Sequence, residues 1–206
     1  MLKRHFGGVF NTSKIIGKIR KSKLLLKNIY NIGMLKVRIP FAHAKSIYEI
    51  DGAFFTKLGV KYVLADLDNT LDSYRTKLPT KQAIELKERL AKDGIELIIV
   101  SNNTGNRVST YANALGVRFL NSVGKPFARR LLKKLAKLNI KKEEVIMIGD
   151  QVVTDITCAN RAKIKSVLTD KIVKEDQITT RFNRLFDRPL RRSLKRKNLL
   201  VDWRNI

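Results

Sequence analysis

Two aspartates separated by a single residue could carry the chemistry of this chain. Asp66 and Asp68 directly follow the apolar run 62–65, which reads as a buried strand. In an extended chain, residues i and i+2 point to the same side, so both carboxylates can face one pocket. A carboxylate that attacks phosphorus forms an aspartyl-phosphate, which divides hydrolysis of a phosphate ester into two easier steps. Asp66 is therefore the predicted nucleophile, and Asp68 the predicted general acid and base.

Two further carboxylates, Asp150 and Asp155, are expected at the same place. Asp150 follows the apolar run 145–148, and Asp155 falls in the first turn of the helix expected after it. Four carboxylates in one crevice repel one another, which raises their pKa values unless a cation offsets the charge. Oxygen ligands of this kind suit a hard ion, and Mg²⁺ is the expected cofactor.

Two polar residues at other strand ends complete this constellation. Ser101 follows the apolar run 95–100, and Lys125 follows the weaker run 117–119. The oxygens of a transferred phosphoryl group need positive and hydrogen-bonding donors. Lys125 supplies a point charge, Ser101 a hydroxyl, and the backbone N–H groups after Asp66 a cradle. Taken alone, such a serine is more often a turn hydroxyl and such a lysine a surface residue, so the predicted shared location carries the assignment.

Apolar runs alternate with amphipathic stretches between residues 62 and 170, a pattern typical of βαβ units and a parallel sheet. A further strand is expected over 166–168. Helices are expected over 80–92, 108–115 and 127–138, ending at Gly94, Gly116 and Asn139 respectively. We therefore predict a three-layer α/β/α, Rossmann-like fold with a mostly parallel sheet. In such folds the site lies outside the carboxyl ends of the strands.

Four short motifs, in this order and spacing, resemble those of the haloacid dehalogenase (HAD) superfamily. They are Asp66-Leu67-Asp68-Asn69-Thr70-Leu71, Ser101-Asn102-Asn103, Gly124-Lys125-Pro126, and Gly149-Asp150 with Asp155. The resemblance implies that Asp66 is nucleophile and metal ligand, and that Asp150 is a metal ligand. Asp68 would be acid and base, with its main-chain carbonyl on the metal. Phosphate contacts would come from Ser101, Asn102 and Lys125, with Thr70 in support, and Asp155 would be an outer metal contact or a partner for Lys125.

Within the superfamily the chain is similar to the YqeG-type phosphatases of subclass IIIA, which include mitochondrial phosphatidylglycerophosphate phosphatases. The similarity extends from about Ile39 to Phe186, and it includes Gly59-Val60-Lys61 and Thr180-Arg181-Phe182-Asn183-Arg184. It implies a HAD-like phosphatase domain over 39–186, a basic N-terminal extension over 1–38 and a basic C-terminal tail over 187–206. Asp68, an aspartate two residues after the nucleophile, also favours phosphoryl transfer over carbon–halogen cleavage.

The spacing between the motifs leaves no room for a large cap domain. Asp68 and Ser101 are 33 residues apart, enough for a loop, one helix and one strand, and Ser101 and Lys125 are separated by only 24. We therefore expect an open site that suits a phosphate on something bulky, such as a phospholipid, a protein or a nucleic acid.

Positive charge dominates both ends of the chain. The formal net charge is +25, with 13 lysines and arginines against 2 acidic residues in 1–61 and 11 against 4 in 171–206. Such a surface attracts RNA, an anionic membrane or a phosphorylated substrate, although it can also merely keep a chain soluble. An apolar stripe over 182–194 lies among arginines, and Pro189 is expected to divide it into two short helices. The stripe can lie on an anionic membrane, contact RNA or pack on the domain.

Other features narrow the class of protein. Cys158 is the only cysteine, so no intramolecular disulfide is possible, and it is expected to be a small buried residue. No apolar run approaches the roughly 18 residues of a membrane span, and no secretory signal is evident, so we expect a cytoplasmic protein, with peripheral membrane attachment as an option.

The main hypothesis is a Mg²⁺-dependent phosphatase that acts on a phosphate monoester, with a phospholipid such as phosphatidylglycerophosphate as one candidate. The alternative is a ribosome- or RNA-associated factor of the same fold that works mainly by binding, although no recognised RNA-binding motif occurs. A phospho-accepting receiver domain ranks below both, because it does not need Asp68 at its position.

Overall fold

The structure, a computed structural model, describes residues 36–103, 105–173 and 178–206, without the side chains of 178–184. Residues Val37–Ile206 form one compact unit, and Met1–Lys36 are a separate unit. The expected basic N-terminal extension thus lies almost wholly outside the described residues. Residues 187–206, expected as a tail, belong to the same compact unit as the sheet.

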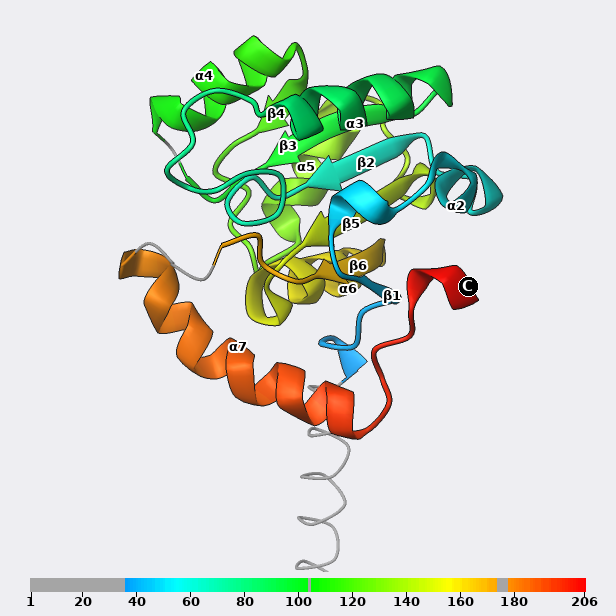
Figure 1. Cartoon of the computed structure of the whole chain (residues 1–206), viewed down its shortest axis with the longest axis vertical. Coiled ribbons are helices and arrows are strands. Elements are labelled where there is room, and N and C mark those ends of the chain that lie inside the picture. Colours follow the sequence, from blue (N-terminus) through cyan, green and yellow to red (C-terminus); the bar gives the residue numbers. More distant parts are fainter. Residues whose placement is uncertain (1–35, 104, 174–177) are drawn as a thin grey trace, which may run out of the picture. The chain divides into compact units, whose positions relative to one another are not determined.

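A six-stranded, all-parallel sheet forms the centre of the main unit, in the order β1-β6-β5-β2-β3-β4 (Figure 1). The strands are β1 (Ala42–Ala44), β2 (Tyr62–Ala65), β3 (Glu96–Val100), β4 (Arg118–Leu120), β5 (Val145–Gly149) and β6 (Lys165–Thr169). The five strands expected from the sequence are all present. The edge strand β1 was not expected, because a three-residue Ala-His-Ala segment carries no apolar run. Strand β2 lies between β3 and β5, with Leu64 opposite Ile98 and Met147.

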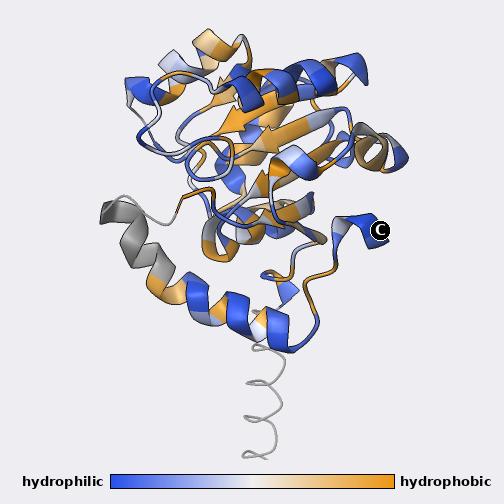
Figure 2. Cartoon of the chain, in the orientation of Figure 1, coloured by the Kyte–Doolittle hydropathy of each residue, from blue (hydrophilic) through white to orange (hydrophobic). Residues whose placement is uncertain are grey.

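Alternate residues of the strands feed two separate apolar cores, which makes three layers. Val63 and Ala65 pack in one core with α3 and α4, whereas Leu64 packs in the other with α5 and α6. The helices are α2 (Gly52–Lys57), α3 (Lys81–Lys92), α4 (Asn106–Leu115), α5 (Arg129–Lys137), α6 (Thr157–Ala162) and α7 (Ile178–Arg196), with short turns η1 (Ile47–Glu49), η2 (Lys142–Glu144), η3 (Val152–Ile156) and η4 (Trp203–Asn205). Figure 2 shows the apolar strands enclosed by helices whose outer residues are hydrophilic. The predicted α/β/α fold is confirmed, with no cap domain in the described residues.

The helix ends follow the local signals in the sequence. Thr80 caps α3, where its Oγ1 accepts a hydrogen bond from the Ala83 N–H, and Gly116 ends α4 in the left-handed conformation at φ 71°. Helix α5 begins at Arg129, two residues later than expected. Phe127 therefore lies outside the helix, 68% exposed, with the Arg161 guanidinium 5.4 Å from its ring centroid.

Helix α7 corrects one expectation, because it is a single helix with Pro189 inside it rather than two short helices. A proline removes one backbone hydrogen bond from a helix interior, but contacts on both sides of it hold α7 on the domain. Before the proline, Asp187 accepts a hydrogen bond from the Val153 N–H at 3.1 Å, and after it Leu194 is buried against Val152. These contacts outweigh the lost hydrogen bond and keep the helix continuous.

The apolar stripe of the C-terminal segment is divided between the interior and the surface. Leu194 is 1% exposed, whereas Leu185 and Phe186 are 66% and 59% exposed. Further along the chain Trp203 packs edge-on against Phe54, with ring centroids 5.8 Å apart. The second half of α7 therefore docks on the domain. In the part of the chain that the structure describes, no helix is long and apolar enough to span a bilayer.

Candidate active site

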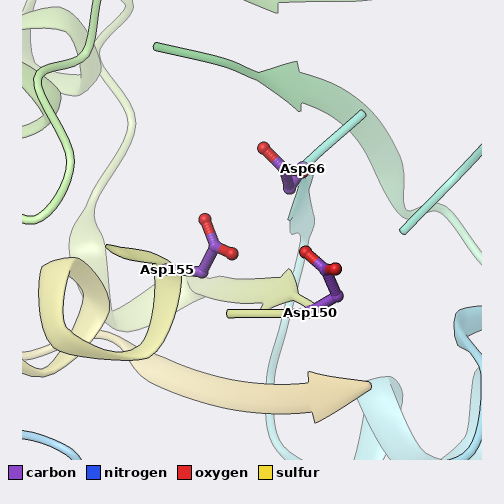
Figure 3. A group of neighbouring side chains, drawn as sticks. All are labelled: Asp66, Asp150 and Asp155. Atoms are coloured by element: carbon purple, nitrogen blue, oxygen red, sulfur yellow. The ribbon is translucent and has the colours of Figure 1, made fainter. Parts of the chain in front are cut away.

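Three buried aspartates meet at the carboxyl edge of the sheet. Asp66 follows β2, Asp150 follows β5 and Asp155 lies in η3, and one oxygen of each lies within 4.8 Å of the others (Figure 3). Strands β2 and β5 are parallel neighbours, and the Asp66 N–H donates to the Ile148 carbonyl at 2.9 Å. The sheet register therefore places Asp66 beside Asp150, as the sequence predicted.

Gly149 allows Asp155 to reach this group. A Cβ atom at position 149 would lie 2.4 Å from the Asp155 Cβ, so only glycine permits this close approach. The Asp155 Oδ2 accepts a hydrogen bond from the Gln151 N–H at 3.1 Å, which closes the segment on itself. In the Gly149-Asp150 motif, Asp150 is thus a candidate metal ligand, and Gly149 leaves room for the Asp155 side chain.

Lys125 provides the positive charge inside the cluster. Its Nζ lies 2.5 Å from the Asp66 Oδ1, 2.7 Å from the Asp155 Oδ1 and 3.3 Å from the Val100 carbonyl oxygen. The Lys125 side chain is only 4% exposed. Hydrogen bonds to Asp66 and to the Val100 carbonyl, together with the ion pair to Asp155, hold the side chain in place. The expected pairing of Asp155 with Lys125 is therefore present.

Asn102 aims Lys125. Its Nδ2 donates to the Lys125 carbonyl and its Oδ1 accepts from the Lys125 N–H, both at 2.7 Å. One of the two Nδ2–H donors is used in this way, so a phosphate contact from Asn102, which stays a prediction, would use the other donor or the backbone N–H. Ser101 is buried at the end of β3, where its Oγ accepts from the Asn103 N–H at 3.0 Å. Both residues thus shape the loop that faces Lys125.

The electrostatics of the cluster favour a bound cation. Burial raises the pKa of Asp66; Lys125 opposes this effect, whereas the nearby Asp155, Asp150 and Asp68 add to it. Burial by itself would lower the pKa of Lys125, but the carboxylates of Asp155 and Asp66 outweigh it and raise that pKa. One ammonium among three ionised carboxylates leaves two negative charges, which a divalent cation would balance. The donor set therefore fits a hard ion such as Mg²⁺.

Asp68 lies beside this cluster but is not part of the three-aspartate group. Its side chain, 22% exposed, forms an ion pair with the Arg107 guanidinium. Arg107 also donates to the Ser73 and Thr76 carbonyls at 3.0 and 3.2 Å. We did not anticipate Arg107 from the sequence. The available signal was a basic residue in the first turn of the helix that follows Ser101.

The loop after Asp68 is fastened by a buried carboxylate that the sequence did not single out. Asp72 Oδ2 accepts from the Tyr111 hydroxyl at 2.5 Å and from the Thr80 N–H and hydroxyl, both at 3.1 Å. Burial, together with this bond, raises the pKa of Tyr111. Thr70, predicted to support the site, is 1% exposed, and its hydroxyl has no hydrogen-bond partner among the described residues. Cys158 is buried as expected, and burial raises its pKa to about 11.

The family follows from comparison with known proteins. A model of the haloacid dehalogenase-like hydrolases matches residues 14–163. This chain belongs to that family. It is 33% identical over 168 residues to the probable phosphatase YqeG of Bacillus subtilis (strain 168). The match covers 82% of this chain and 97% of that relative. These findings confirm the resemblance of the four motifs, and the chain is a HAD-type phosphatase.

Solved structures share parts of this backbone. An uncharacterized protein from Listeria monocytogenes serotype 4b is 20% identical, with a TM-score of 0.46 over 58% of this chain and 86% of that one. The 3-deoxy-D-manno-octulosonate 8-phosphate phosphatase from Moraxella catarrhalis, in complex with magnesium, phosphate and KDO, is 22% identical, with a TM-score of 0.40 over 48% of this chain and 63% of that one. Both similarities concern the fold alone.

Proposed function

We propose that this protein hydrolyses a phosphate monoester through an aspartyl-phosphate on Asp66, with Mg²⁺ as cofactor. The observation that carries the proposal is the contact of 2.5 Å between the Lys125 Nζ and the Asp66 Oδ1, inside a cluster that also holds Asp150 and Asp155. The nucleophile needs the phosphoryl group of the substrate beside it. The buried Lys125 ammonium can bind a phosphoryl oxygen there, and the excess of carboxylates can bind a cation.

Asp66, Asp150 and Asp155 are the side chains that would hold the ion. When bound, Mg²⁺ would neutralise negative charge on the phosphoryl oxygens and on the carboxylates themselves. The main-chain carbonyl of Asp68 stays a proposed further ligand. Lys125 would meet another phosphoryl oxygen, and the backbone N–H groups after Asp66 and around Ser101 would complete the cradle.

In the first step an Asp66 oxygen forms a bond to phosphorus as the bond between phosphorus and the ester oxygen breaks. Asp68 gives its proton to the departing alcohol. In the second step water attacks phosphorus, Asp68 takes a proton from it, and the bond between phosphorus and Asp66 breaks to release phosphate. Asp68 is the more exposed of the two carboxyls, which gives it access to the substrate and to water.

The substrate we propose is a phosphate on a bulky anionic group, for which a lipid such as phosphatidylglycerophosphate is the leading candidate. The described residues contain no inserted domain that would close over Asp66. Helix α7 presents the exposed apolar side chains of Leu185 and Phe186 beside the exposed Arg188. An apolar and basic surface of this kind suits the interface of an anionic bilayer.

The test compares phosphate release from three types of substrate: phosphatidylglycerophosphate in vesicles, a small sugar phosphate and a phosphorylated oligonucleotide. We expect release that needs Mg²⁺, stops with EDTA, and is lost in Asp66→Asn but kept in Glu85→Gln, an exposed acid on α3. Preference for the lipid supports the proposed substrate. Salt-sensitive RNA binding by both variants without phosphate release from any substrate would instead support the RNA-associated alternative.

A further inference from the structure

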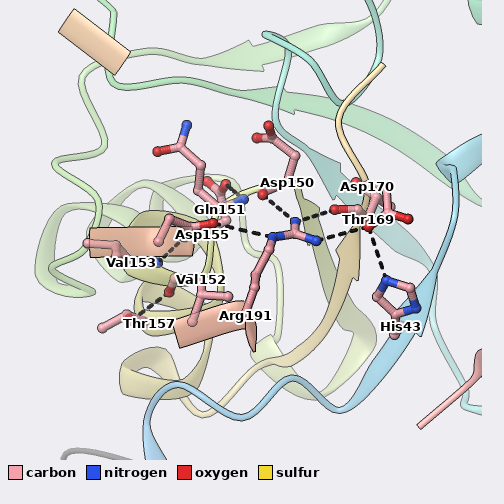
Figure 4. Close-up of polar contacts among 11 residues, drawn as sticks. His43, Asp150, Gln151, Val152, Val153, Asp155, Thr157, Thr169, Asp170 and Arg191 are labelled. Atoms are coloured by element: carbon pink, nitrogen blue, oxygen red, sulfur yellow. Dashed lines mark hydrogen bonds and ion pairs between the residues drawn. The ribbon is translucent and has the colours of Figure 1, made fainter. Parts of the chain in front are cut away.

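Helix α7 reaches the segment that carries two of the three clustered aspartates through one guanidinium group (Figure 4). The Arg191 Nη2 donates to the carbonyl oxygens of Asp150 and Thr169, both at 2.5 Å. Its Nη1 lies 3.0 Å from the Asp170 Oδ1, and its Nε lies 3.3 Å from the Asp187 Oδ2. Arg191 therefore joins the ends of β5 and β6 to α7.

Asp187 provides a second attachment one helical turn earlier. It is 1% exposed, and while one carboxylate oxygen accepts from Arg191, the other accepts from the Val153 N–H at 3.1 Å. Buried carboxylates are stable only where such donors surround them, so Asp187 and Arg191 depend on each other. Together they hold the main chain at residues 150 and 153.

The segment between these attachments leads directly to Asp155. The Asp155 N–H donates to the Gln151 carbonyl at 3.0 Å, and the Gln151 N–H donates back to the Asp155 side chain at 3.1 Å. Thr157 extends the same turn through its hydroxyl, which donates to the Val152 carbonyl at 2.8 Å. A shift of the chain at residue 150 or 153 therefore moves the carboxylates of both Asp150 and Asp155 relative to Asp66.

We propose that Arg191 and Asp187 are positioning residues that set the affinity of the three-aspartate site for its divalent cation. This inference rests on the proposed function, since it concerns the same ion. Neither residue touches the ion or the substrate; they act through the main chain of the segment that carries the ligands. Loss of an outer partner of this kind costs about 10–100-fold in metal affinity or activity.

The sign of the effect separates positioning from charge. The Arg191 guanidinium is a positive charge beside the Asp150 main chain, so by Coulomb's law alone its removal would strengthen the binding of a cation. Loss of positioning has the opposite effect, because the carboxylates no longer converge. A weaker affinity in a variant without Arg191 can therefore come from geometry but not from the change in charge.

The experiment measures Mg²⁺ binding to the full chain by isothermal titration calorimetry, with Mn²⁺ electron paramagnetic resonance as a second probe. We expect the Kd for Mg²⁺ to rise about 10–100-fold in Arg191→Ala. The matched control is Arg192→Ala, which removes the same charge from the next residue, whose side chain is exposed. It should stay within about twofold of the unchanged protein. Saturating Mg²⁺ should restore most of the kcat of Arg191→Ala while the activation constant stays high.

Two further variants cover the case in which Arg191→Ala does not fold, as judged by circular dichroism. Arg191→Lys keeps the charge but has no planar fork to serve several acceptors, so we expect an intermediate Kd. Asp187→Asn keeps the size and should also weaken binding. An unchanged or tighter Kd in these folded variants would overturn the inference, as would an equal loss in Arg192→Ala. Absence of Mg²⁺ binding in the unchanged protein would instead overturn the proposed function itself.

Discussion

Two networks of charged groups lie at the same edge of the sheet, and they differ in how they are built. In the first network the Lys125 Nζ lies 2.5 Å from the Asp66 Oδ1 and 2.7 Å from the Asp155 Oδ1. All three residues come after strands of the parallel sheet. The second joins Asp187 and Arg191 of α7 to the main chain of Asp150 and Thr169. The side chains of the first network can bind a substrate, whereas Arg191 and Asp187 of the second form hydrogen bonds with the backbone. Chemistry and its mechanical support thus come from different parts of the chain.

The largest effect is expected from a substitution at Lys125, which breaks the first network. Lys125→Ala should lower kcat for phosphate release by about 10²–10³-fold, because a preorganised donor to the phosphoryl oxygens is lost. It should also lower the unfolding temperature measured without metal, since the carboxylates of Asp66 and Asp155 would stay buried without the Lys125 ammonium. Added Mg²⁺ should recover part of that stability. Lys133→Ala, an exposed lysine on α5, should change neither quantity.

The pH dependence of metal binding sharpens the account of the same network. Burial, with the neighbouring carboxylates, raises the pKa of Asp66, so the metal-free protein holds a proton there at a pH where an ordinary aspartate is ionised. Mg²⁺ must displace that proton, so its affinity should fall as the pH falls through the raised pKa, by up to about tenfold per pH unit. Calorimetry in two buffers of different ionisation enthalpy would count the protons released. Equal affinity across pH 5–8 and no proton release would contradict this explanation.

A smaller effect is expected where a buried network lies outside both of these. Tyr111→Phe removes the hydroxyl that donates to Asp72 at 2.5 Å, and hydrogen bonds to charged groups contribute about 1.5–3 kcal/mol. Urea unfolding should show a loss of this size in the free energy of unfolding. Tyr74→Phe, whose hydroxyl accepts from Arg75, should cost less than about 0.5 kcal/mol. Similar losses in both variants would mean that Asp72 does not depend on Tyr111.

The smallest effect concerns the continuity of α7. Pro189→Ala restores a backbone N–H inside the helix, so it should stabilise the chain by about 1 kcal/mol in urea unfolding, with no change in Mg²⁺ affinity. If residues 178–196 were two short helices divided at Pro189, the same substitution would be neutral or destabilising.

The sequence was sufficient for the first network because parallel strands impose its location. Once Asp66, Ser101, Lys125 and Asp150 each follow an apolar run, the carboxyl edge of one sheet must bring them together. Their exact partners were less accessible, since the contact of Asn102 with the Lys125 main chain depends on the path of two loops.

The second network could not be predicted in the same way. Arg191 stands among several arginines of similar context, and only the docking of α7 decides which of them points inward. Pro189 misled for a related reason, because tertiary contacts at Asp187 and Leu194 override the local preference against proline. Arg107 and Asp72 were missed because single charged residues carry no pattern of their own.

The claim that Asp66 is the nucleophile is tested most directly by quenching the reaction in acid during turnover and locating phosphate on the protein by mass spectrometry. The account predicts phosphate on the peptide that contains Asp66, released by hydroxylamine as expected for an acyl phosphate, and absent in Asp66→Asn. Phosphate release at an undiminished rate by Asp66→Asn, or phosphate attached to any other residue, would contradict it.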